Sequence, residues 1–224
     1  MQFASTFYRT YSLDLWGFGD SAKLTSRYSF EWQIALLAGF VEHMGIRNFS
    51  IIGHGLGAIL ALYFAGDRPM EIDQLMVIGY PLGSHAINHR LASGSPIQLA
   101  DWLFGKSIDT KALKEDSSRT DSQAITTTLA QFRKVNWRQL SSRTQRPSLW
   151  LYGQDDPLIK CPGEKEISFF PRTGHFLPFE KSGHYPMLDE PHKFNRLLID
   201  FLSISSDQDL HELQIKEEWR RRIR

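Results

Sequence analysis

Residues 49–66 form the segment that most restricts what this chain can fold into. A short apolar run, Phe49–Ile52, leads into the glycine-rich stretch Gly53–Gly57, and apolar residues then recur at helical spacing as far as Phe64. The sequence Gly66-Asp67-Arg68-Pro69 then closes the segment. We therefore expect a buried strand that turns sharply into a helix at Gly55.

Strand and helix patterns alternate along much of the remaining chain. Helices of amphipathic pattern are expected at 29–44 and 195–202, with a short helix at 163–170. Strand-like runs are expected at 9–14, 74–79, 147–153 and 175–180. This alternation predicts an α/β fold in which a mostly parallel sheet is flanked by helices.

Residues 83–146 differ from the flanking segments in composition. They are richer in serine, threonine, glutamine and charged residues, and they contain helical patterns at 96–104 and 121–135. We interpret them as a helical cap inserted into a core built from residues 1–82 and 147–203.

Residues 204–224 carry the pattern of an amphipathic helical tail. Glu217 and Glu218 precede Arg221 and Arg222 by four residues, a spacing that stabilises a helix. The tail is expected to pack on the body of the protein, and contact with a partner or a membrane surface through residues 207–224 is the alternative.

Composition excludes several classes of function. With 26 basic and 25 acidic residues among 224, the net charge of +1 gives no reason to expect nucleic acid as a partner. Cys161 is the single cysteine, and the sequence holds neither a signal-peptide pattern nor an apolar run long enough for a membrane span. We therefore expect a cytoplasmic protein without a disulfide framework.

Four ordered motifs indicate a family. They are Asp14–Ser21, the glycine turn Gly53–Ala58, Gly153–Pro157 and Ser182–Pro191. Each motif is weak alone, but their order resembles that of the α/β-hydrolase superfamily over residues 8–202. The superfamily's nucleophile elbow, G-x-S-x-G, places a serine on a strained turn between strand and helix.

The resemblance implies roles for individual residues. His184 would be the catalytic base and Asp156 the acid that orients it, with Asp155 as the neighbouring alternative to Asp156. The nucleophile position is occupied by Gly55, which has no hydroxyl group. Conventional serine-esterase chemistry is therefore not expected.

The start of the chain is a second departure from the family pattern. Superfamily members usually carry further strands and a His-Gly loop for the oxyanion hole ahead of the Asp14–Ser21 motif, whereas this chain begins almost at that motif. We expect either an N-terminally incomplete chain whose first strands are absent, or direct pairing of the strand carrying Leu13 with the elbow strand.

Three functions are compatible with these motifs. The first is an impaired hydrolase, or pseudoenzyme, that binds a small apolar or ester-like molecule through Gly53, His54 and Leu56, with Trp102 and Phe132 in the cavity wall together with Phe104 and Trp137. The second is an active hydrolase or lyase in which His184 and Asp156 act as a general base on water or substrate.

The third function is dinucleotide binding, because Gly53–Ala58 also fits the G-x-G-x-x-[GA] pattern. That pattern requires an acidic residue at the end of the next strand, where the chain has Tyr80 and Pro81. No cofactor is expected. His85 and His89 lack a plausible third ligand, so no metal site is expected either.

Overall fold

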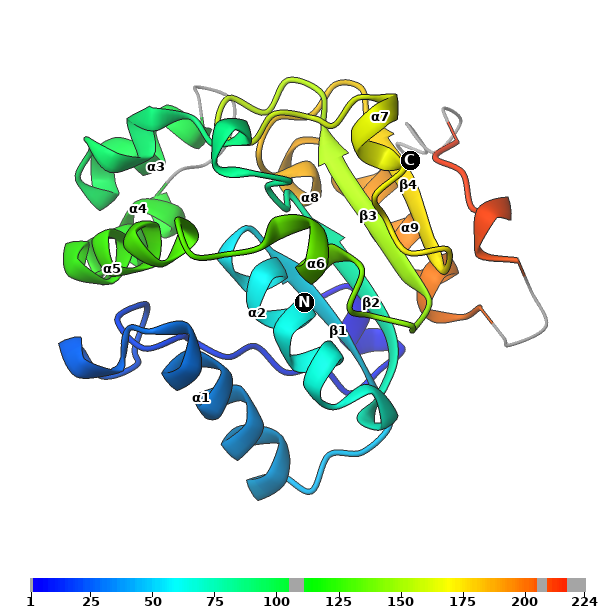
Figure 1. The fold of residues 1–224 in the computed structure, drawn as a ribbon, viewed down its shortest axis with the longest axis horizontal. Helices are drawn as coiled ribbons and strands as arrows, with labels where there is room; N and C mark the ends of the chain where they lie inside the picture. Colours follow the sequence, from blue (N-terminus) through cyan, green and yellow to red (C-terminus); the bar gives the residue numbers. More distant parts are fainter. Residues whose placement is uncertain (1, 105–110, 205–208, 217–224) are drawn as a thin grey trace.

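The computed structural model describes residues 2–104, 111–204 and 209–216. Four parallel strands form one sheet in the order β1-β2-β3-β4, so strand order follows chain order (Figure 1). The strands are β1 (Phe49–His54), β2 (Ile72–Ile78), β3 (Ser148–Gly153) and β4 (Gly174–Phe179). The predicted α/β-hydrolase type of α/β fold is confirmed.

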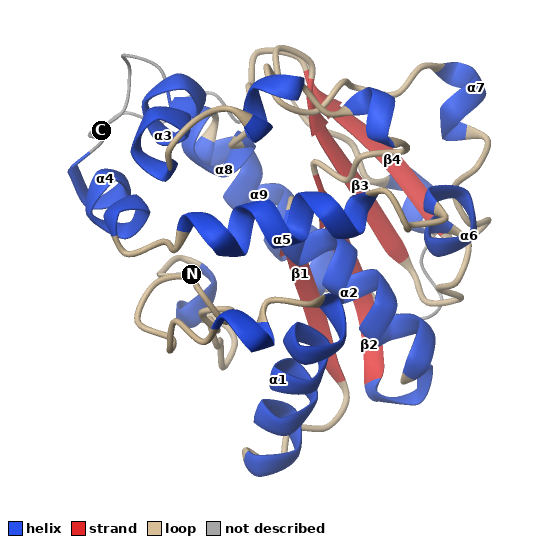
Figure 2. Cartoon of the chain, turned by 60° about the vertical axis from the view of Figure 1, so that its left-hand side comes forward, coloured by secondary structure: helices blue, strands red, loops and turns tan. Residues whose placement is uncertain are grey.

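Helices cover both faces of the sheet (Figures 1 and 2). The described helices of the core are α1 (Phe30–His43), α2 (Leu56–Asp67), α7 (Glu164–Ile167), α8 (Pro186–Asp189) and α9 (Pro191–Leu202). Between β2 and β3 lie α3 (Pro96–Phe104), α4 (Lys111–Ser118), α5 (Ser122–Phe132) and α6 (Trp137–Ser141). Short 3-10 turns lie at Ala4–Thr6, Thr25–Arg27, Pro69–Glu71, Ser84–Ala86, His89–Ala92 and Leu210–Glu212.

Alternating side chains divide the core between the two faces of the sheet. Leu75 and Val77 of β2 pack with the apolar residues of α2, whereas Met76 and Ile78 pack with those of α9. A strand that is buried on both faces has a continuous apolar sequence. Packing of β2 on both faces of the sheet therefore explains why its sequence is an apolar run. No helix within the described ranges is long and apolar enough to cross a bilayer.

The expected strand at 9–14 is wrong. These residues join no ladder, and within the described ranges β1 pairs with β2 alone, so Leu13 does not pair with the elbow strand. Instead, the Tyr11 ring packs against Phe40 of α1, with ring centroids 5.5 Å apart. The Asp14 carboxylate accepts a hydrogen bond of 2.9 Å from the amide of Asp20. A segment of strand composition forms a strand only where a partner backbone is present. Residues 9–14 have no such partner and make local loop contacts instead.

The expected helical tail is also wrong where the structure describes it. Only the 3-10 turn at Leu210–Glu212 is helical there. Residues 213–216 have no regular secondary structure, the backbone of Leu213 is extended, and the side chains of Leu213 and Ile215 pack against the α9 side of the core. Side chains two residues apart share a face in extended chain, so this packing does not need a helix. Residues 205–208 and 217–224 lie outside the described residues.

Candidate active site

The turn between β1 and α2 holds Gly55 in a backbone conformation that side-chain-bearing residues rarely adopt. Its φ and ψ are 56° and −115°, and α2 begins at the next residue, Leu56. The Gly55 amide donates to the carbonyl oxygen of Ile78 at 2.9 Å, which fixes the turn at the carboxyl end of β1. Glycine adopts this conformation without the steric cost that a Cβ atom brings.

Gly53 allows strand and helix to approach closely. A Cβ atom at Gly53 would lie 2.4 Å from the carbonyl oxygen of Gly57, a backbone atom that cannot move aside. A Cβ at Gly57 would meet nothing within 4 Å. Of these two glycines, the close approach of strand and helix therefore requires only Gly53.

His184 and Asp156 are brought together as a buried pair. The Nδ1 atom of His184 lies 2.8 Å from Oδ2 of Asp156, and the two side chains are 5% and 2% exposed. The other carboxylate oxygen of Asp156 accepts from the amides of Leu158 and Ile159 at 2.7 and 3.0 Å. Asp155, the alternative acid, is exposed and makes no such contact with the imidazole.

This geometry assigns the imidazole tautomer. A carboxylate only accepts hydrogen bonds, so Nδ1 of His184 carries the proton that it donates to Asp156, and Nε2 is left as an acceptor. Nε2 is directed toward the elbow, where a Cβ at Gly55 would lie 3.9 Å away. A group attached at that position would be within reach of a general base.

His54 lies beneath this pair. Its ring is 4.5 Å from the His184 ring, and its Nε2 donates to the backbone carbonyl oxygen of His184 at 2.8 Å. Burial, with a smaller contribution from His184, lowers the pKa of His54 to about 3. His54 is therefore neutral at physiological pH and holds the backbone of His184.

We expect the stability of the protein to fall on acidification because of His54. In the unfolded chain a histidine gains its proton near pH 6.5, whereas folded His54 does so only near pH 3. The contribution of His54 to the free energy of unfolding is therefore fully present above pH 6.5. It is lost, at up to about 1.4 kcal/mol per pH unit, as the pH falls below that value. Burial also lowers the pKa of His175, which adds in the same direction.

Urea unfolding at pH 7 and pH 5.5 measures this loss. In His54→Gln, whose amide can still donate to the His184 carbonyl, the free energy of unfolding should decline less between the two pH values. Equal declines in variant and parent would assign the pH dependence to other groups.

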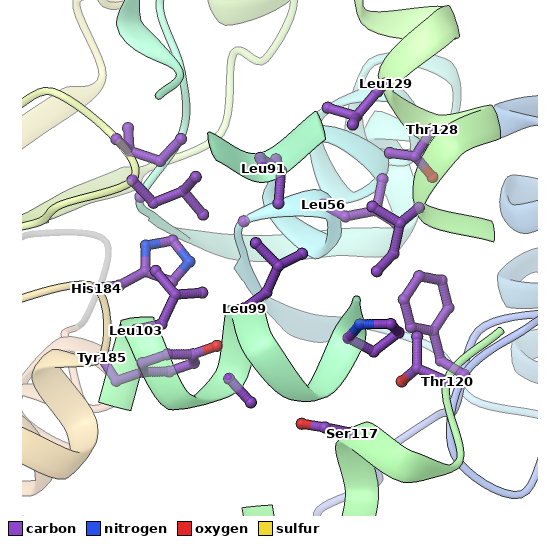
Figure 3. A pocket seen from close by; sticks show the side chains of 18 of the residues that line it. Leu56, Leu91, Leu99, Leu103, Ser117, Thr120, Thr128, Leu129, His184 and Tyr185 are labelled. Atoms are coloured by element: carbon purple, nitrogen blue, oxygen red, sulfur yellow. The ribbon is translucent and has the colours of Figure 1, made fainter. Parts of the chain in front are cut away.

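A largely apolar cavity of about 240 Å³ opens above Gly55 and His184 (Figure 3). Its floor includes Gly55 and Leu56 at the start of α2, and its far wall comes from α3 and α5. The amide of Leu56, as the first residue of the helix, has no acceptor inside α2. The site therefore combines an imidazole with a free acceptor nitrogen, a helix N-terminus and a largely apolar cavity.

The helical phase of α3 decides which of its side chains face the cavity. Pro96, Leu99, Ala100, Leu103 and Phe104 line it, with the three- and four-residue spacing of one helix face. Trp102 falls on another face, where the guanidinium of Arg90 lies 4.8 Å from its ring.

Of the wall residues expected from the sequence, Phe132 and Phe104 line the cavity, whereas Trp102 and Trp137 do not. Trp137 packs against Tyr80 instead. The sequence reasoning missed Phe18, Thr128 and Tyr185, which also line it. Tyr185 carried a signal, because it directly follows His184 in the Ser182–Pro191 motif.

The structure also locates the groups relevant to the other candidates. Asp73 lies near the amino end of β2, opposite the end of the sheet that carries Gly55, and Tyr80 is buried with its hydroxyl donating to Trp137. Neither can serve as the ribose-binding acid of a dinucleotide site. His85 lies 3.4 Å from Glu166, and no cluster of three potential metal ligands occurs in the described part of the chain.

Comparison with known proteins places this geometry in context. The family model described as "Alpha/beta hydrolase family" matches residues 2–197. An uncharacterized protein of Mycobacterium tuberculosis is 26% identical over 246 residues, which cover 93% of this chain and 71% of that protein.

Two solved structures share the fold. An esterase from Exiguobacterium antarcticum superposes with a TM-score of 0.72 at 15% identity, covering 85% of this chain and 80% of the esterase. A serine-to-glycine mutant of the N-acyl homoserine lactonase AidH, complexed with N-hexanoyl homoserine lactone, gives a TM-score of 0.68 at 21% identity. That match covers 84% of this chain and 77% of the lactonase.

Proposed function

Since the chain belongs to the α/β-hydrolase family, we propose that it binds a small, apolar, ester-like molecule in the cavity above Gly55 and does not hydrolyse it through a serine nucleophile. The observation that carries the proposal is the elbow itself. Gly55 occupies the turn opposite Nε2 of His184, and the position from which an attacking hydroxyl would extend has no side chain.

The cavity supports a binding role. Its wall is largely aliphatic and aromatic, and its volume of about 240 Å³ exceeds the roughly 150 Å³ that accommodates benzene in an engineered protein cavity. In proportion to the volume that accommodates benzene, a ligand that fills this cavity has about ten non-hydrogen atoms. Residues 83–146, which supply α3 and α5, act in this proposal as the cap over the ligand.

A second candidate function is hydrolysis without a covalent intermediate. The buried pair of His184 and Asp156 favours it, because Nε2 is free to take a proton from a water molecule between the imidazole and Gly55. General-base catalysis of this kind contributes roughly 10²- to 10⁴-fold to a rate. The carbonyl group would be polarised by the N-terminus of α2.

Turnover by the native chain and by His184→Ala separates the two functions. With p-nitrophenyl acetate as substrate, the binding function predicts that both proteins release p-nitrophenol at the same slow rate. The general-base function predicts a loss of about 10²-fold in the variant. Rapid hydrolysis by the native chain with a trapped acyl-enzyme, detected by mass spectrometry, would contradict both.

A further inference from the structure

Tyr185 is held rigidly in the cavity wall beside His184. Its ring stacks on Phe104, with centroids 4.4 Å apart and an interplanar angle of 28°. The Tyr185 and His184 rings are nearly perpendicular, with centroids 4.9 Å apart, and the His54 centroid lies 5.0 Å from that of Tyr185. Three aromatic neighbours therefore fix the direction of the phenol.

The hydroxyl of Tyr185, a partly buried residue, differs from those of the buried tyrosines. Tyr28, Tyr80 and Tyr152 donate to Asp121, Trp137 and Tyr80 at 2.6, 2.8 and 2.7 Å. The Tyr185 hydroxyl has no hydrogen-bond partner among residues 2–104, 111–204 and 209–216, and it points toward the cavity interior (Figure 3). A tyrosine hydroxyl that lines a largely apolar cavity and has no partner within the described residues is available to donate to a ligand.

Burial also keeps this hydroxyl a donor. It raises the pKa of Tyr185 far above its ordinary value, so the phenol remains protonated over the whole stable pH range. In a largely apolar cavity, a fixed O–H group favours a ligand that offers a neutral acceptor, such as the carbonyl oxygen of an ester or ketone.

We propose that Tyr185 is the specificity-determining residue of this site and donates a hydrogen bond to the carbonyl oxygen of a neutral acyl compound. The inference rests on the binding function proposed above and names its ligand class. Thr128 of α5 supplies another cavity hydroxyl, on the opposite side from Tyr185 (Figure 3). A helical threonine can turn its hydroxyl back to the carbonyl four residues earlier, whereas Tyr185 has no such option.

A matched pair of probes tests the proposal on the native chain. Acetophenone and α-methylstyrene have the same shape, but only acetophenone carries a carbonyl oxygen, and neither can be hydrolysed. Calorimetry should show that acetophenone binds about 2- to 10-fold more tightly, the range expected for one neutral hydrogen bond. This comparison requires no variant. Equal affinities would overturn the role of Tyr185, and no binding of either probe would overturn the binding function itself.

Two variants test whether Tyr185 is the donor. Tyr185→Phe keeps the ring stack and should remove the preference for acetophenone while leaving the affinity for α-methylstyrene unchanged. Thr128→Val removes a hydroxyl from the same cavity and should preserve the preference. The reverse result, with the preference lost in Thr128→Val and kept in Tyr185→Phe, would place the carbonyl group at α5 and refute the proposal.

Discussion

Gly55→Ser is expected to raise the hydrolysis of p-nitrophenyl acetate by at least about 10²-fold over the native chain. The added Cβ would lie 3.9 Å from Nε2 of His184, which brings a serine hydroxyl within hydrogen-bonding reach of the imidazole. Asp156 already fixes the imidazole with Nε2 as acceptor. The serine would therefore enter a site whose base and acid are in place.

Two controls test whether the gain in hydrolysis rate depends on His184 and on the position of the new hydroxyl. Adding His184→Ala to Gly55→Ser should return the rate to that of the native chain, since the hydroxyl would have no base. Gly57→Ser adds a hydroxyl where a Cβ meets nothing within 4 Å, away from His184, and should leave the rate unchanged. If the gain in hydrolysis rate persisted in the double variant, the serine at residue 55 would not be using His184 as its base.

Gly153→Ala is expected to destabilise the protein by about 3 kcal/mol or more. A Cβ at this residue would lie 2.0 Å from the carbonyl oxygen of Gly183 and 2.4 Å from that of Ser182. Both are backbone atoms, so the loop that leads into His184 must move as a unit. For a chain of this length the loss corresponds to a fall in Tm of about 6–12 °C.

Gly39→Ala is the matched control. Gly39 lies inside α1, and a Cβ there would meet no atom within 4 Å. Alanine loses less backbone entropy than glycine on entering a helix, so this variant should gain about 0.5–1 kcal/mol. Thermal unfolding monitored by circular dichroism compares the two. If Gly153→Ala unfolds within 2 °C of the parent protein, roughly the shift for 1 kcal/mol or less, the close approach of β3 to the His184 loop would be disproved.

The sequence predicted the features of the fold that depend on local patterns. The runs at β2 and β3 were predictable because strands covered on both faces are apolar at successive positions, whereas β1 and β4, at the edges of the sheet, are only partly buried. The order of the motifs likewise indicated that His184 and Asp156 meet. The strand runs carry their signal in neighbouring residues, whereas the meeting of His184 and Asp156 was implied by the resemblance to the α/β-hydrolase superfamily.

Features that depend on distant partners could not be predicted. Residues 9–14 have strand composition, but a strand also requires an adjacent backbone, which composition does not reveal. Trp102 was selected for its size, while the helical phase of α3 directs Leu99 and Leu103 into the cavity. The hydroxyl of Tyr185 becomes informative only when its neighbours are known.

The backbone of Gly55 has a consequence for how this site can change over time. Serine at a φ of 56° would be strained by roughly 1–3 kcal/mol, whereas glycine adopts the same turn without that strain. Selection for folding stability alone would therefore retain glycine. Some glycine and serine codons differ by a single nucleotide, so selection for catalysis could restore the hydroxyl in one mutational step. Stability and hydrolytic chemistry therefore favour different residues at this one codon.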